Sequence, residues 1–145
     1  MISTSVLQKA MRQIEAKRED FTLFALLRRA DAPSGNWDLV VSAPWLESGT
    51  LKATGEVINL LVEAIGRESV NQIARVEVID EDSPKAKFIR TNLWVENDRE
   101  LRVQSTDLLG LEIEEGIVFR AKRPDAKKSA GKSLQPAAAG SRGRR

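Results

Sequence analysis

The pattern of apolar and polar positions divides the first third of the chain into one helical and two extended segments. Residues 5–18 repeat apolar side chains every three or four positions, which predicts an amphipathic helix. The next segment, FTLFALLRRA (21–30), is a continuous apolar run ending in charge and is typical of a buried strand. A dense turn signal, DAPSGN (31–36), joins it to WDLVVSA (37–43). The two runs therefore predict a β-hairpin.

After Pro44 the period changes to that of a second helix, whose packed face should carry the apolar residues. The residues of that predicted face are Leu51, Ile58, Leu61, Val62 and Ile65. Gly66 follows them where a left-handed backbone would end the helix.

The second half of the domain predicts further strands around short helical turns. A turn at about 69–73 precedes the first of these strands, and Ser83-Pro84 is a helix start signal, with the helix ending near Ile89. The predicted strands are RVEVID (75–80), NLWVE (92–96), ELRVQ (100–104) and GIVFRA (116–121). Asn97-Asp98 lies between the second and third of them, which is typical of a hairpin.

This order predicts a single α+β domain. We expect a mixed, mainly antiparallel sheet of about six strands packed against two principal helices. The globular domain should cover residues 1–123, and residues 124–145 should form a disordered basic C-terminal tail. That tail is rich in Pro, Ala, Gly, Ser and Lys, and Leu134 is its only sizeable apolar residue. It therefore has too little apolar surface to offset the entropy of ordering.

Composition excludes several classes of chemistry. The chain has no cysteine, histidine or tyrosine, so thiol catalysis, Ser-His-Asp hydrolysis and zinc or haem sites built on Cys or His are excluded. No cofactor is expected. No apolar stretch approaches the roughly 18–20 residues that span a bilayer, and the first residues lack the apolar core of a secretory signal. We therefore expect a cytoplasmic protein without membrane contact.

The net charge of +2 hides a division between the two parts of the chain. The last 26 residues hold nine basic side chains and one acidic one, Asp125, which gives +8; the remaining 14 basic and 20 acidic residues give −6. Basic disordered ends bind DNA or RNA through phosphate contacts. The candidate contacts are Arg120, Lys122, Arg123, Lys127, Lys128, Lys132, Arg142, Arg144 and Arg145. A tail that only solubilises the domain, or folds back on it, is the competing interpretation.

Three carboxylates are the weak candidates for catalysis. Asp38 opens a strand, and Glu77 and Asp80 belong to the acidic stretch of another. Carboxylates at neighbouring strand ends can hold Mg²⁺ for phosphoester chemistry. However, RVEVIDED lacks the Lys two residues after Glu that nuclease sites of the Asp…Glu-x-Lys type carry. We therefore prefer the interpretation that these three carboxylates are solvated strand ends that hold no metal.

The three tryptophans bear on partner binding. Trp37 and Trp94 lie in or beside predicted strands and are expected to cover the ends of the core. Trp45 follows a proline in a loop and is the candidate partner surface, because tryptophan is enriched at interaction hot spots. The preferred function is a small non-enzymatic interaction or accessory domain that binds another protein or itself. The alternatives are a nucleic-acid-associated protein acting through the tail and a Mg-dependent carboxylate enzyme acting on phosphoesters.

Overall fold

The computed structural model describes residues 3–29, 37–95, 99–108 and 111–122 of the chain. The elements within these residues are α1 (Thr4–Lys17), β1 (Leu23–Arg29), β2 (Asp38–Ser42), α2 (Leu51–Ile65), α3 (Arg67–Val70), β3 (Arg75–Val78), α4 (Pro84–Asn92), β4 (Leu101–Leu108) and β5 (Leu111–Ala121). Of the predicted turns, 31–36 and 97–98 lie outside the described residues, as does the tail after Lys122.

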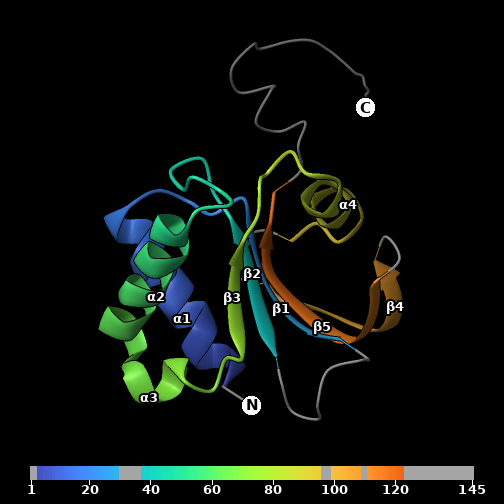
Figure 1. Cartoon of the computed structure of the whole chain (residues 1–145). Helices are drawn as coiled ribbons and strands as arrows, with labels where there is room; N and C mark the ends of the chain where they lie inside the picture. Colours follow the sequence, from blue (N-terminus) through green and yellow to red (C-terminus); the bar gives the residue numbers. More distant parts are fainter. Residues whose placement is uncertain (1–2, 30–36, 96–98, 109–110, 123–145) are drawn as a thin grey trace.

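The strands form one mixed sheet in the order β3-β2-β1-β5-β4 (Figure 1). Neighbouring strands are antiparallel except for β2 and β3, which are parallel. The predicted α+β class, with a mainly antiparallel sheet and a β1–β2 hairpin pairing, is confirmed. Helices α1, α2 and α3 cover one face of the sheet, while α4 lies on the other (Figure 1).

Strand periodicity builds two cores, one on each face of the sheet. Along β2, Leu39 and Val41 face the α1–α3 side, and Val40 between them faces the α4 side. The larger core, beneath α1–α3, includes Leu7, Met11, Ile14, Phe21, Phe24, Leu26, Trp37, Val57, Leu61, Ile117 and Phe119. The smaller core includes Leu23, Ala25, Leu27, Ile89, Val95, Val118 and Ala121.

The predicted strand 92–96 is wrong in its pairing. Helix α4 continues to Asn92, and only Val95 of this segment joins the sheet in the described chain. Its backbone N–H and carbonyl exchange hydrogen bonds of 3.0 and 2.9 Å with Ala121. The predicted partner segment belongs to β4, which pairs with β5 instead. The described sheet therefore has five strands, close to the expected six.

Local signals give the start of α4 and the end of α2 as predicted, although α4 ends at Asn92 rather than near Ile89. The Ser83 hydroxyl accepts a hydrogen bond of 3.2 Å from the Ala86 N–H, and Pro84 occupies the first turn of α4. Gly66 ends α2 at φ 89°, the left-handed region that favours glycine.

Arg90 fastens α4 to the sheet, although it was not among the residues singled out from the sequence. Its side chain is only 1% exposed. Its Nε donates to the Lys122 carbonyl at 2.7 Å, and its Nη1 donates to the Glu81 carbonyl at 2.9 Å. Burial lowers the pKa of the Arg90 guanidinium, against the smaller raising effects of Glu81 and Asp82. Among the described residues, no helix has the length and apolar character needed to cross a membrane.

Candidate functional site

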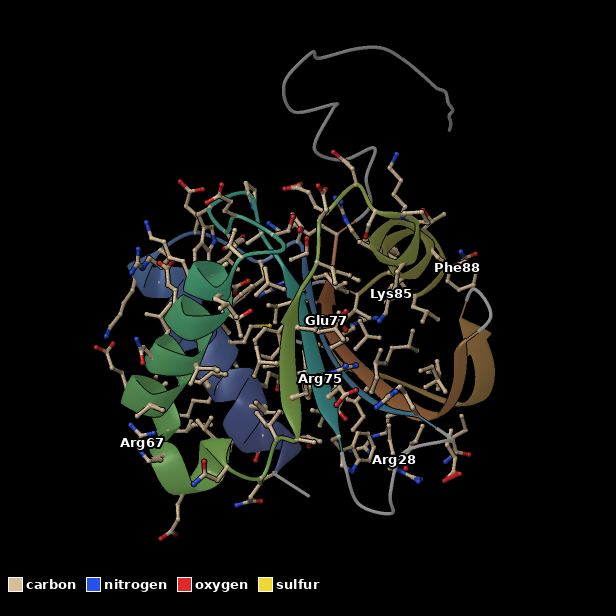
Figure 2. All side chains as sticks on the ribbon, in the orientation of Figure 1. Arg28, Arg67, Arg75, Glu77, Lys85 and Phe88 are labelled. Atoms are coloured by element: carbon tan, nitrogen blue, oxygen red, sulfur yellow. The ribbon has the colours of Figure 1, made fainter. Side chains whose placement is uncertain are left out.

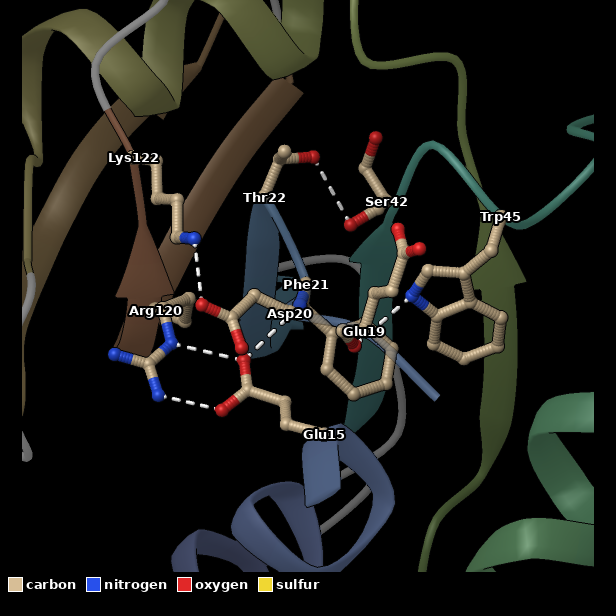
Figure 3. A network of polar contacts seen from close by, with 9 residues as sticks. All are labelled: Glu15, Glu19, Asp20, Phe21, Thr22, Ser42, Trp45, Arg120 and Lys122. Carbon is tan, nitrogen blue, oxygen red and sulfur yellow. Dashed lines mark hydrogen bonds and ion pairs between the residues drawn. The ribbon is translucent and has the colours of Figure 1, made fainter. Parts of the chain in front are cut away.

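A network of polar contacts closes the end of the domain where α1 meets the sheet (Figure 3). Arg120 binds both carboxylate oxygens of Glu15, at 3.0 and 2.6 Å, and the same carboxylate accepts the Phe21 N–H at 3.0 Å. Lys122 contacts Asp20 at 2.8 Å. These contacts tie β5 to α1 and to the turn after it. Two of the candidate nucleic-acid contacts, Arg120 and Lys122, are thus paired with carboxylates of the domain.

The other basic candidates, Arg123, Lys127, Lys128, Lys132, Arg142, Arg144 and Arg145, lie outside the described residues. Their contact with DNA or RNA stays a prediction.

Two of the candidate carboxylates, Asp38 and Glu77, meet at one cation, and Asp80 lies apart from them. The Nη2 atom of Arg75 is 3.1 Å from the Asp38 carboxylate and 3.9 Å from that of Glu77. The expectation that Asp38 is a solvated strand end is wrong, because Asp38 is buried at the start of β2 and paired with Arg75 at 3.1 Å and with Arg29 at 3.3 Å. The sheet register places Glu77 of β3 opposite Val40, on the same face.

Figure 2 shows Arg75, Glu77 and Lys85 on the side of the sheet that carries α4. The Glu77 carboxylate is 3.4 Å from the Lys85 ammonium. Asp80, by contrast, accepts the Asp82 N–H at 2.8 Å within the loop before α4. In the described part of the chain, no three acidic side chains are grouped so as to hold a metal ion.

A second charged cluster surrounds Arg28 at the end of β1. Its guanidinium donates to the carboxylates of Glu114 and Glu115 and lies 5.6 Å from the Trp37 ring centroid. The hydrogen bond to Glu114 is the main cause that raises the pKa of Arg28, with desolvation acting against it. Trp37 itself is buried, as predicted. These contacts link the end of β1 to β5.

Trp45, the candidate partner residue, lies half-buried in the turn after β2. Its indole N–H donates to the Glu19 carbonyl at 3.0 Å (Figure 3). The ring packs on Phe21 with centroids 5.4 Å apart, and the Arg18 guanidinium lies 5.9 Å from its centroid. The ring is thus held in one orientation while part of its surface stays open to solvent.

A groove of about 950 Å³ opens beside Trp45. It is lined by Lys17 and Arg18 at the end of α1, by Trp45, and by one side of α2 from Leu51 to Glu63. This size matches the upper part of the range for ligand pockets, roughly 300–1,000 Å³. An open groove between two helices is a form that suits a peptide segment.

Two ion pairs bridge the helices along this groove. Lys17 contacts Glu63 at 3.0 Å, and Arg18 contacts Glu56 at 3.0 Å. Both carboxylates of the groove are therefore neutralised by α1. Lys52 also lines the groove, and it has no ion-pair partner among the residues the structure describes.

Three neighbouring positions of α2 are locally unfavourable for an isolated helix. Leu51 is 92% exposed, which is the greatest exposure of any large apolar residue in the described chain. Lys52 lies in the first turn, which has no acidic side chain, although the positive end of the helix dipole disfavours a cation there. Gly55 interrupts the helix, yet a Cβ atom at this position would meet nothing within 4 Å.

Four of the five residues predicted for the packed face of α2 do pack there: Leu61 is buried, and Ile58, Val62 and Ile65 lie against the core. The prediction is wrong for Leu51. The buried residues of α2 are Ala53, Val57, Leu60 and Leu61. At 100° per residue, Leu51 lies roughly 135° from the centre of these buried positions, so it falls outside the buried side of the helix. An exposed apolar residue beside a helix-interior glycine was the signal that could have located the groove.

Trp94 is a further correction. It was expected to cover the core, but it is 46% exposed. It lies two residues beyond the end of α4, between Leu93 and Val95, both of which pack in the smaller core.

No protein-family model, no curated protein and no solved structure matches this chain. Function is therefore inferred from the chain's own residues.

Proposed function

We propose that this chain is a non-enzymatic interaction domain that binds another protein through the groove beside Trp45. The observation that supports this most strongly is the clustering of Leu51, Lys52 and Gly55 on the rim and wall of one groove. Each of these three residues is unfavourable for the stability of the domain without a partner. Residues that break local folding rules together, without compensation inside the chain, tend to mark functional sites.

The chemistry of the groove suits a protein partner. A fixed tryptophan beside an exposed leucine offers an apolar anchor point, and aromatic anchors dominate binding energy at interfaces. Charged side chains flank these two residues, as in the polar rim of an interface. Because the chain has no cysteine to form disulfides, we place this binding in the cytoplasm.

The proposal is tested by partner recovery from cells of the chain's own organism. Tagged full-length protein is compared with the Leu51→Glu variant by quantitative mass spectrometry of the proteins that co-purify. A matched control is Gln72→Glu, which adds the same charge at an exposed position outside the groove. At least one partner should be lost with Leu51→Glu and kept with Gln72→Glu. An identical set of proteins from all three would refute the proposal.

A second candidate is nucleic-acid binding by the tail, which the charge division favours. With Arg120 and Lys122 paired to Glu15 and Asp20, seven basic residues after Lys122 remain for phosphate contacts. Such binding should be strongly salt-dependent and insensitive to base sequence. Full-length protein without affinity for DNA or RNA at low salt would exclude it. The carboxylate–metal alternative has no supporting observation of this kind.

A further inference from the structure

We infer that the groove beside Trp45 takes an acidic amphipathic segment of a partner protein, with an apolar anchor against Trp45 and Leu51 and a carboxylate facing Lys52. This inference rests on the proposed function and names the chemistry of the occupant. It follows from the charges of the groove, from the shape of its α2 wall and from the chemistry of the competing occupants.

The charge of the groove favours an acidic occupant. The Glu56 and Glu63 carboxylates are each 3.0 Å from a cationic group of α1, so Lys52 is the charge left uncompensated. Lys52 is exposed and lies in the first turn of α2, where the helix dipole adds partial positive charge. A carboxylate brought there by a partner would be attracted by both, and it would relieve the repulsion between Lys52 and the helix end.

The shape of the groove favours a segment that comes close to α2. Gly55 lines the groove, and a side chain at this position would project into open space. The missing side chain allows the backbone or a side chain of an occupant to approach the helix surface. Leu51 on the same stretch of α2, and Trp45, which also lines the groove, supply apolar surface for an anchor. An amphipathic segment with apolar residues three and four positions apart fits this arrangement.

The Lys52 charge and the apolar surface of the groove disfavour the other candidate occupants. The chain's own tail carries seven basic residues and one acidic residue after Lys122, so it would meet Lys52 with like charge. A nucleic acid would bring phosphates to Lys52 but has no aliphatic side chain to anchor against Leu51. A second copy of the chain is the remaining alternative, and the experiment separates it from a foreign segment.

The experiment measures peptide binding to the full-length protein by fluorescence anisotropy. The probe is a synthetic amphipathic peptide with leucines three and four positions apart and glutamates on its polar face. Matched probes replace these glutamates with glutamine or with lysine, and another probe carries the sequence of residues 124–145. The glutamate peptide should bind about five- to tenfold more tightly than the lysine peptide, with the difference shrinking in high salt.

Three variants separate the groove from the charge. Leu51→Ser and Gly55→Leu should weaken binding of every peptide, because one removes an anchor and the other fills the groove. Lys52→Glu should reverse the preference, so that the lysine peptide binds more tightly than the glutamate peptide. Gln72→Glu should change none of these affinities. Melting temperatures of all variants should stay at or above that of the wild type, which shows that lost binding is not lost folding.

Each other outcome counts against the inference. If Leu51→Ser and Gly55→Leu weaken binding but Lys52→Glu leaves the preference unchanged, the groove binds segments without regard to charge, and only the proposed function stands. If the peptide of residues 124–145 binds best, the tail is the occupant. Sedimentation of the protein alone as a dimer that Leu51→Ser dissociates would make a second copy the occupant. If no groove variant affects binding, both the inference and the proposed function fall.

Discussion

Gly55 is the residue at which stability and the proposed binding should oppose each other. Glycine in a helix interior is destabilising by roughly 0.5–1 kcal/mol relative to alanine, and a Cβ here has open space around it. Gly55→Ala should therefore raise the free energy of unfolding by about that amount. Urea denaturation of the full-length protein measures the change. A destabilised variant would mean that the glycine is needed for folding rather than for the groove.

Thr22, just before β1, and Ser42, at the end of β2, provide a matched pair of buried hydroxyl groups. The Thr22 hydroxyl donates to the Ser42 carbonyl at 3.0 Å, whereas the Ser42 hydroxyl is fully buried without a hydrogen-bond partner in the described structure. Removing a bonded hydroxyl loses about 1 kcal/mol, while removing an unsatisfied one is neutral or stabilising by up to roughly 1 kcal/mol.

We therefore expect Thr22→Val to lower the urea midpoint. Ser42→Ala should leave the urea midpoint unchanged or raise it. Equal destabilisation by both substitutions would show that the Ser42 hydroxyl has a partner, such as a buried water.

At the scale of elements, α4 depends on one buried side chain. Arg90 donates to the carbonyls of Lys122 and Glu81, which belong to segments before and after the helix in sequence. Arg90→Met keeps much of the volume but leaves both carbonyls without this donor, and we expect a loss of roughly 2–4 kcal/mol. Lysine at this position cannot reach both carbonyls as the guanidinium does, so Arg90→Lys should also destabilise.

The loss should not depend on pH in the neutral range. Burial lowers the pKa of Arg90 in the folded state, so the charged form carries a penalty that is present below the folded pKa and relieved only as pH rises through it. Because arginine keeps its proton in proteins, that window lies far above neutrality. Denaturation of wild type and Arg90→Met at about pH 6 and pH 8 should give the same difference. A difference that changed between these values would implicate another titrating group.

The sequence predicted those elements whose boundaries depend on residues close together in the chain. Helix α4 has its serine cap and proline in adjacent positions, and the β1–β2 hairpin joins two apolar runs close in sequence. The error at Val95 has a different origin, because its partner Ala121 lies far along the chain. The exposure of Leu51 was missed for a similar reason, since contact with α1 and the sheet decides which residues of α2 are buried. The sequence therefore pointed to the groove only through Trp45, which is one of the residues that line it.

At the scale of the whole molecule, the acidic domain and the basic tail should be separable. Arg120 and Lys122, the last two basic residues that the structure describes, are paired with Glu15 and Asp20. The sequence beyond them holds a single sizeable apolar residue, Leu134. Deleting residues 125–145 should leave the free energy of unfolding nearly unchanged, because almost no apolar burial is removed. Thermal denaturation of both forms tests this. A fall of several degrees in the melting temperature of the truncated form would show that the tail packs on the domain.

The most direct measurement on the central claim is photo-crosslinking from the groove in living cells. A benzophenone amino acid replaces Leu51 in the full-length protein, and the same residue replaces Gln72 as a control outside the groove. We predict a discrete crosslinked adduct from position 51, none from position 72, and loss of the adduct when Gly55→Leu fills the groove. Equal adducts from both positions, or no adduct from position 51, would contradict a docking surface beside Trp45.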